Sequence, residues 1–297
     1  PALKQIVVRT VGEISARRLQ LVNGDADIIE QVPVDQAAAL KGDPNIVVES
    51  NPSLYVNYVY MNNKRPPLDD ARVRQAISYA VDYKGIVDGI MQGQAEQMRG
   101  AVPDGMWAHD PNGFQYSYDV EKAKALLKEA GKSDIHLTYT FSQADTAWEP
   151  VGLALQANLA DIGIKLDLQA VADTTKREMA ASGNYDLAPG AWTPDFADPY
   201  MFMNYWFDPD RMGGPGNRAF YNNPKVAGLV REAASIIDQP KREQLYLEAQ
   251  KLSTQDAPYL YLMQKNDIFA RRAVVKGYVY NPMLIQVYNF ATMSKSE

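Results

Sequence analysis

The residues best suited to bind a ligand lie in one short stretch, residues 190–207, with the sequence GAWTPDFADPYMFMNYWF. Seven of its eighteen residues are aromatic, against 10% in the whole chain, and Asp195 and Asp198 are its only charged residues. Prolines on either side of the carboxylates predict that a strand ends here and that a loop opens into a helix near Tyr200. An aromatic wall beside a fixed carboxylate suits an organic ligand with a positive or hydrogen-bond-donating group.

The same residues also fit a structural or an enzymatic role. The aromatic side chains could form core, with Asp198 capping a helix. Asp195 and Asp198 could imitate the acid pair of a glycosidase, although such pairs come from separate elements and need a raised pKa. His109 and His136 lack the spacing of a metal-binding pair, and the sequence has no GxSxG motif. We therefore expect no catalytic residue, no metal ligand and no cofactor.

Length and composition narrow the class of protein. At roughly 150 residues per domain, a chain of 297 residues predicts two lobes. The net charge of −6 provides no broad basic surface, which argues against a nucleic-acid partner. No window holds eighteen uninterrupted apolar residues, so we expect no membrane span. The absence of cysteine excludes disulfides and thiolate metal sites.

The elements that must position the 190–207 stretch alternate between strands and helices. The N-terminal part predicts strands at 6–9, 27–32 and 45–49 and helices at 13–22 and 33–40. The rest predicts strands at 54–62, 136–141, 164–171, 185–192, 259–263 and 268–271, and helices starting near 70 and at 120–130, 148–162, 174–181, 225–237 and 241–254. This alternation is typical of βαβ units and predicts an α/β fold.

Five segments occur in the order YMNNKRPPLDDARVRQAISYAVDYKGIVDGIMQGQAEQ, YSYDVEKAKALLKEAG, LQANLADIGIKLDLQ, YDLAPGAWTPDFADP and REQLYLEAQKLSTQDAPYLYL. In this order they resemble the extracytoplasmic solute-binding proteins of family 5, which are the peptide, nickel and opine receptors of ABC importers. The resemblance covers nearly the whole chain. It implies a two-lobed periplasmic-binding-protein-like fold of class II (cluster C).

Family members are about half as long again or more, so the resemblance implies that much of the first lobe is missing from this chain. Residues 1–56 and 266–297 would be the remnant of lobe I, and residues 57–265 would be lobe II. The implied function is capture of a solute in the interlobe cleft and delivery to a membrane permease. The implied location is the periplasm, or the outer face of the membrane, with a membrane anchor in a Gram-positive host. We also expect a monomer.

The resemblance also implies where the ligand binds. In peptide-binding members the backbone after the strand at 185–192 pairs with an extended ligand, and the Asp of a W-x-x-D segment holds its α-amino group. The matching residues are Trp192 and Asp195. Arg177 matches a pocket-lining position, with an exposed helix residue as the alternative, and Asn62 and Asn217 complete the predicted ligand-binding set.

The sequence departs from the dipeptide-binding pattern at one place that bears on the ligand. Those members carry an Arg pair that holds the ligand carboxylate, and Glu149 and Pro150 stand at the matching positions. Lys176 and Arg177 are the nearest basic alternatives. Ala191 replaces the usual Gly before the Trp, which limits how closely a ligand backbone approaches.

The resemblance does not name the solute, since peptide, opine, oligosaccharide and metal-chelate receptors share this scaffold. A hydrolase acting on glycosides or peptides is one alternative function. A chaperone-like binding module is another, because a shortened first lobe would leave an aromatic patch of the second lobe exposed.

Overall fold

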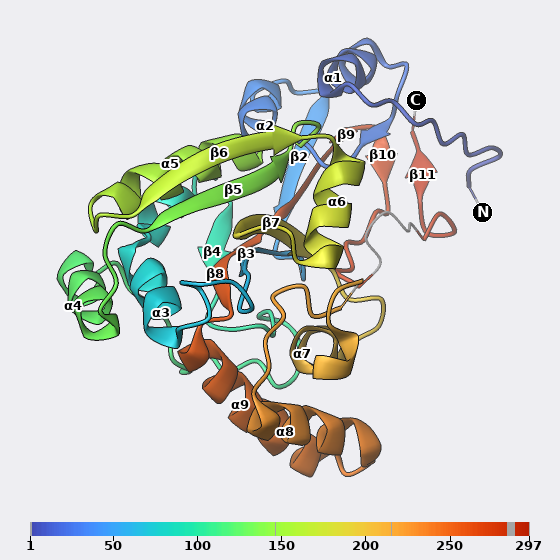
Figure 1. The fold of residues 1–297 in the computed structure, drawn as a ribbon. Helices are drawn as coiled ribbons and strands as arrows, with labels where there is room; N and C mark the ends of the chain where they lie inside the picture. The colour runs from blue at the N-terminus through green and yellow to red at the C-terminus, as the bar shows by residue number, and fades with distance from the viewer. Residues whose placement is uncertain (1, 146, 215, 284–288, 297) are drawn as a thin grey trace. The chain divides into compact units, whose positions relative to one another are not determined.

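The computed structural model describes residues 2–145, 147–214, 216–283 and 289–296, which fold into two compact units (Figure 1). One unit combines Pro1–Ser53 with Lys265–Glu297, and the other is the continuous segment Leu54–Gln264. The sequence-based boundaries were placed at 56/57 and 265/266. Parts of the predicted lobe I remnant, residues 1, 284–288 and 297, lie outside the described residues.

The discontinuous unit contains a three-stranded antiparallel sheet in the order β1-β9-β2. Its elements are α1 (Ile14–Asn23), β1 (Ile28–Ile29), α2 (Val34–Leu40), β2 (Ile46–Asn51) and β9 (Asp267–Arg272), with a second antiparallel pair formed by β10 (Val275–Lys276) and β11 (Ser294–Lys295). Leu21, Leu40 and Ile268 belong to its small core. The C-terminal strand β9 therefore pairs between two N-terminal strands.

The strand expected at residues 6–9 is not present. Ile6, Val7 and Val8 have irregular backbone and are 48%, 62% and 85% exposed. β-Branched residues favour extended backbone, but a strand also requires a partner for its ladder. No strand of the described residues pairs with this segment.

The continuous unit is built on a six-stranded mixed sheet in the order β4-β8-β3-β7-β5-β6. The strands are β3 (Val56–Met61), β4 (Ala95–Gln97), β5 (His136–Ser142), β6 (Lys165–Val171), β7 (Leu187–Trp192) and β8 (Tyr259–Lys265). β3 is antiparallel to both β7 and β8, whereas β5 is parallel to β6 and β7. Every residue of β3 is buried, because β3 lies between β8 and β7 near the middle of the sheet.

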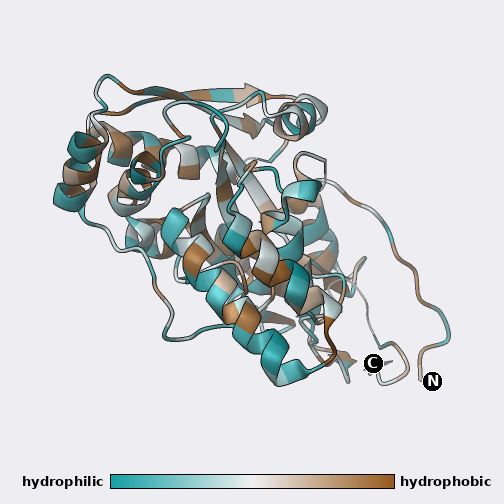
Figure 2. Cartoon of the chain, turned by 60° about the horizontal axis from the view of Figure 1, so that its bottom comes forward, coloured by the Kyte–Doolittle hydropathy of each residue, from teal (hydrophilic) through white to brown (hydrophobic). Residues whose placement is uncertain are grey.

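Seven α-helices of this unit flank the sheet or continue from it: α3 (Ala71–Ala80), α4 (Val120–Ala130), α5 (Trp148–Ala160), α6 (Asp173–Ser182), α7 (Tyr200–Phe207), α8 (Pro224–Ser235) and α9 (Gln239–Asp256). The short helices Gly85–Ile90 and Pro209–Arg211 complete the set of helices in the described part of the unit. Capping explains several starts: the side chains of Asp70, Asp119 and Asn223 accept hydrogen bonds from backbone N–H groups of α3, α4 and α8. Figure 2 shows hydrophobic and hydrophilic residues alternating along the helices, as expected for helices with one packed face.

The two faces of the sheet pack differently. Val59 and Met61 point into the main core, together with Ile77 of α3 and Leu155 of α5. The alternate residues of β3 belong to an aromatic layer, in which the ring centroid of Tyr58 lies 4.4 Å from that of Trp206 and 5.2 Å from that of Tyr60. The aromatic helix α7 therefore packs on this second face of the sheet.

Candidate functional site

Trp192 is the last residue of β7 and lies opposite Val56 of β3. Its side chain is partly buried and lies against the ring of Tyr205, with 5.9 Å between centroids. The indole Nε1 is buried without a hydrogen-bond partner among the described residues. A buried donor without a partner is unusual in a folded protein, and a ligand acceptor would satisfy it.

The two carboxylates of the aromatic stretch have different surroundings. Asp198 is partly buried and accepts hydrogen bonds from Arg242 Nη2 at 3.0 and 2.9 Å and from the backbone N–H of Tyr200 at 2.9 Å. Asp195 is exposed and has no hydrogen bond or ion pair within the described part of the chain. The structural role that the sequence allowed for Asp198 is confirmed, and ligand binding by Asp195 stays a prediction.

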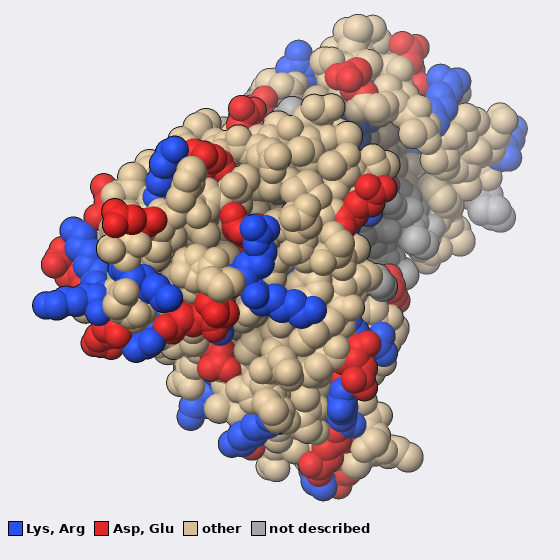
Figure 3. Space-filling view, in the orientation of Figure 1, with Lys and Arg blue, Asp and Glu red and all other residues tan. Residues whose placement is uncertain are grey.

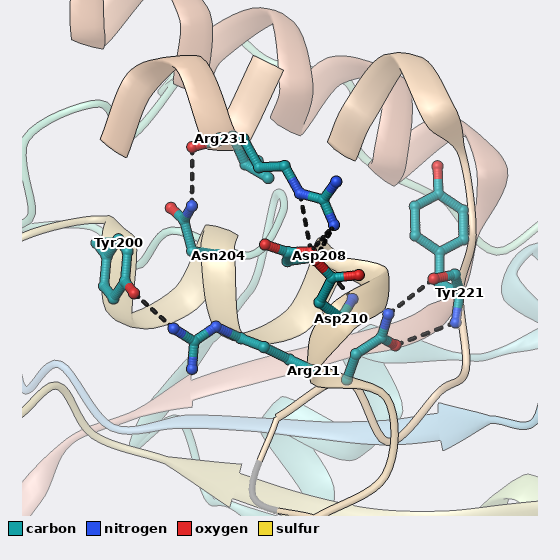
Figure 4. Close-up of polar contacts among 9 residues, drawn as sticks. Tyr200, Asn204, Asp208, Asp210, Arg211, Tyr221 and Arg231 are labelled. Carbon is teal, nitrogen blue, oxygen red and sulfur yellow. Dashed lines mark hydrogen bonds and ion pairs between the residues drawn. The ribbon is translucent and has the colours of Figure 1, made fainter. Parts of the chain in front are cut away.

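The aromatic residues of the stretch divide between core and surface. Phe202, Trp206 and Phe207 are at most 2% exposed, whereas Phe196 is 49% exposed. The partly exposed rings Tyr200 and Tyr205 contact Arg211, whose Nη2 donates to the hydroxyl of Tyr200 at 2.6 Å (Figure 4). The Arg211 guanidinium also lies 4.5 Å from the centroid of the Tyr205 ring. The core interpretation is therefore confirmed for Phe202, Trp206 and Phe207, and the ligand-wall interpretation stays a prediction for the exposed and partly exposed rings.

The backbone of β7 has an open side near the site. The N–H of Asn62 donates to the carbonyl of Asp186 at 3.0 Å. An antiparallel ladder alternates, so residues 188, 190 and 192 bond to β3, while Pro189 and Ala191 direct their backbone groups away from it. On that far side β5 pairs with β7 only at Leu187. Proline has no backbone N–H, so Pro189 loses no ladder hydrogen bond on this unpaired side. No described strand pairs with the backbone of Ala191 on the same side.

The other predicted ligand-binding residues have settled structural partners. Asn62 is fully buried, and its Nδ2 donates to the carbonyls of Gly183 and Tyr185, both at 2.8 Å. Asn217 is also fully buried, and its side chain exchanges two hydrogen bonds with the backbone of Tyr221. These amides shape the ends of β3 and of the glycine-rich loop. They have no role in the function proposed below.

Arg177 is a surface residue of α6. Its Nε donates to Asp173 at 2.7 Å, and its side chain is 67% exposed. This exposure and pairing fit the exposed-helix alternative, and the pocket-lining role of Arg177 stays a prediction. Its neighbour Lys176 is instead partly buried and faces the aromatic layer, with its Nζ 6.0 Å from the Tyr60 ring centroid.

Arg218 is a candidate binding residue that the sequence did not single out. It follows the glycine-rich loop, is partly buried, and its Nη1 donates to the hydroxyl of Tyr60 at 3.3 Å. Burial and the nearby Arg218 lower the pKa of Lys176 from 10.5 to about 8. Arg218 and Tyr60 are 158 residues apart in the chain, so their contact could not be predicted from a local sequence pattern.

No group of three or more His, Asp or Glu side chains in the described residues is arranged to hold a metal ion. Basic and acidic side chains are intermixed on the face shown in Figure 3. None of the helices in the described ranges is both long and apolar enough to cross a bilayer.

The sequence pattern of bacterial extracellular solute-binding proteins, family 5 (middle part), matches residues 1–214. The chain belongs to this family. This family 5 chain is 48% identical over 295 residues to the probable D,D-dipeptide-binding periplasmic protein of Escherichia coli (strain K12), covering 99% of the chain and 57% of that relative. It is 28% identical to heme-binding protein A of Haemophilus influenzae, covering 94% of the chain and 52% of that protein.

A solved structure confirms the fold. The family 5 chain matches the periplasmic binding protein DppA of Helicobacter pylori in complex with the peptide STSA, with a TM-score of 0.87 and 27% identity. The match covers 97% of this chain and 56% of that one. The predicted α/β, periplasmic-binding-protein-like fold is therefore confirmed, and the chain spans about half the length of the relatives it matches.

Proposed function

We propose that the protein is an extracytoplasmic receptor that captures a short peptide or peptide-like solute and delivers it to the permease of an ABC importer. The observation that carries the proposal is Asp195, an exposed carboxylate without a protein partner among the described residues, three residues after the end of β7. The E. coli relative is named for D,D-dipeptides, and the H. pylori protein was solved with a peptide. Both support a peptide-like solute.

In the proposed complex, Ala191, Asp195 and Trp192 each make a different contact with the solute. An extended solute lies along the open side of β7 and bonds to the backbone of Ala191. Asp195 accepts hydrogen bonds from the solute ammonium, a charge-assisted contact worth ~1.5–3 kcal/mol. Trp192 covers an apolar part of the solute and offers its unpartnered Nε1–H as a donor.

The proposal also covers the lobes, the oligomeric state and the location of the receptor. Leu54–Gln264 forms lobe II, and the discontinuous unit belongs to lobe I. The receptor acts as a monomer in the periplasm, or anchored to the membrane in a Gram-positive host. Opines and oligosaccharides are the competing solute classes.

The test uses the longest natural polypeptide that contains this sequence. Calorimetry measures binding of D-alanyl-D-alanine, L-alanyl-L-alanine, their N-acetyl derivatives, an opine and a neutral oligosaccharide. We expect a dipeptide to bind and N-acetylation to weaken its binding by about 10- to 150-fold, because the ammonium is lost. Asp195→Asn should produce a similar loss for the unmodified dipeptide.

Asp161→Asn is the matched control, since Asp161 is also exposed and its side chain has no partner among the described residues. It should bind as wild type. Binding of only the opine or the oligosaccharide would overturn the peptide assignment. Mass spectrometry of the recovered solute tests for a hydrolase: turnover of the dipeptide would overturn the receptor function.

A further inference from the structure

Lys176 and Arg218 hold two cationic groups beside the ring of Tyr60. The Lys176 Nζ and the Arg218 guanidinium carbon each lie 6.0 Å from the ring centroid, and Arg218 also donates to the Tyr60 hydroxyl. Both side chains are partly buried. Two like charges brought together out of water repel and are poorly solvated, so a bound anion would stabilise the pair.

The protein does not supply that anion within the described residues. Arg218 Nε donates to the carbonyl of Gly214 at 2.8 Å, and no carboxylate of the described residues forms an ion pair with either cation. Asp173 and Asp145 act on Lys176 only from a greater distance, and Asp173 is already paired with Arg177. Several other arginines of the unit have carboxylate partners, namely Arg65, Arg72, Arg231 and Arg242, whereas the buried Arg74 donates to backbone carbonyls instead.

The cationic pair lies on the same face of the sheet as Trp192. Tyr60 is opposite Ala188 in the β3–β7 ladder and Trp192 is opposite Val56, so alternation places these side chains on one face. A Cβ on Gly190 would lie 2.6 Å from the Tyr60 hydroxyl oxygen, so this hydroxyl lies directly over the backbone of Gly190. Glycine at this position is what allows the hydroxyl to approach.

The spacing along the chain gives an upper limit for the size of the solute. Asp195 lies five positions after Gly190, which is at most about 17 Å of extended chain. At about 3.4 Å per residue, an extended peptide of up to about five residues fits within this limit. The limit therefore admits a short peptide with its ammonium at Asp195 and its carboxylate near Gly190.

We propose that Lys176 and Arg218, with the Tyr60 hydroxyl, bind the carboxylate of the solute. The proposal rests on the proposed peptide-receptor function and defines the solute as a short zwitterion. It also accounts for the departure at Glu149 and Pro150, because the carboxylate contact moves to α6 and to the segment after the glycine-rich loop. An Arg fork beside a Lys ammonium and a hydroxyl is well matched to a carboxylate.

The test compares D-alanyl-D-alanine and L-alanyl-L-alanine with their C-terminal amides, using calorimetry on the longest natural polypeptide. We expect the wild type to bind a free acid at least about 10-fold more tightly than its amide. Lys176→Gln and Arg218→Gln should each weaken binding of the acid by about 10-fold and change binding of the amide by less than about 2-fold. Arg177→Gln, an exposed cation next in the chain, should behave as wild type.

The outcomes separate the two proposals. Equal binding of acid and amide by the wild type, or an equal loss for both in the Lys176 variant, would overturn the carboxylate site and leave the receptor function standing. If no dipeptide in either form binds the wild type, the peptide-receptor function fails and the carboxylate site fails with it. If Arg218→Gln does not fold, which circular dichroism identifies, the Lys176→Gln variant carries the test.

Discussion

At the scale of single residues, identical side chains three positions apart have opposite roles. Asp198 is paired with Arg242 and bonded to the start of α7, whereas Asp195 has no partner in the described structure. A partly buried carboxylate with three hydrogen bonds stabilises the fold, and an exposed one without partners contributes little to stability. The difference predicts separable effects of the two mutations.

Asp195→Asn should weaken binding of an ammonium-bearing solute by ~1.5–3 kcal/mol and leave the melting temperature within about 1 °C. Asp198→Asn should instead lower the free energy of unfolding by ~1–3 kcal/mol, because Arg242 loses its charged partner. Denaturant titration and calorimetry measure the two quantities. Unchanged binding by Asp195→Asn would show that this carboxylate does not contact the solute.

Lys176 predicts a pH dependence of binding. Its pKa is lowered to about 8 by burial and by Arg218 and Arg177, while Asp173 and Asp145 act in the opposite direction. A bound carboxylate favours the charged form and raises this pKa, so affinity should be constant below about pH 7 and fall as the pH rises through 8. Calorimetry at pH 8 in buffers of different ionisation enthalpy should detect proton uptake, which Lys176→Gln should reduce to the part taken up by the solute amino group.

The lowered pKa also has a consequence for stability. Because the pKa is about 8 in the folded state and 10.5 for an ordinary lysine, charged Lys176 destabilises the folded state below pH 8, and this cost disappears as the pH rises towards 10.5. Lys176→Met should therefore stabilise the protein at pH 7 by about 1 kcal/mol. If Lys176 instead stabilises the fold, Lys176→Met should lower the melting temperature of the protein.

At the scale of elements, the site depends on how β3 and β7 face each other. A Cβ on Gly190 would approach Tyr58 to 2.5 Å and Tyr60 to 2.6 Å, so the glycine allows two tyrosines to pack over the strand. The central position of β3 then leaves these rings no room to withdraw, since Tyr58 and Tyr60 are at most 4% exposed. The strand pair and the aromatic layer form one packed element.

Gly190→Ala should therefore destabilise the protein by ~1–3 kcal/mol, because the inserted methyl group displaces packed rings. Gly228→Ala is the matched control in the interior of α8, where a Cβ meets nothing within 4 Å. That change should stabilise by ~0.5–1 kcal/mol through helix propensity. Chemical denaturation measures both, and a neutral Gly190→Ala would contradict the packing described.

Trp192 and Phe202 offer a second comparison on neighbouring elements. Trp192 is partly exposed at the end of β7, while Phe202 of α7 is fully buried. We expect Phe202→Ala to cost ~3–5 kcal/mol of stability and Trp192→Ala to cost less than half as much while weakening solute binding. A Trp192→Ala variant that melts early yet binds with wild-type affinity in the cold would assign Trp192 to the core.

At the scale of the whole molecule, the chain is organised as two units, one continuous and one assembled from both ends of the sequence. Limited proteolysis should cut first in the exposed segment around Val7 and Val8, which has irregular backbone. The segment Leu54–Gln264 should resist cleavage as one body. A first cut between Gly163 and Gly183 would contradict this division, and mass spectrometry of the fragments identifies the sites.

The sequence by itself determined the local elements and the family. Helical periodicity, capping residues and terminal glycines predicted α4 and α5 to within two residues, because these signals act between residues close in the chain. Five short segments in order predicted the family, which the match over residues 1–214 confirmed. The position of Asp195 after a strand end was also readable, since prolines and aromatic residues mark it locally.

Only the tertiary structure decided which charged groups are free. Asp198 meets Arg242 across 44 residues, and Arg218 meets Tyr60 across 158, so no local pattern could separate Asp198 from Asp195 or bring Arg218 to Lys176. The strand expected at 6–9 failed for the same reason, because a strand needs a partner that the sequence does not name. Charge compensation and strand pairing are properties of residues brought together by folding, and they are therefore fixed only when the chain has folded.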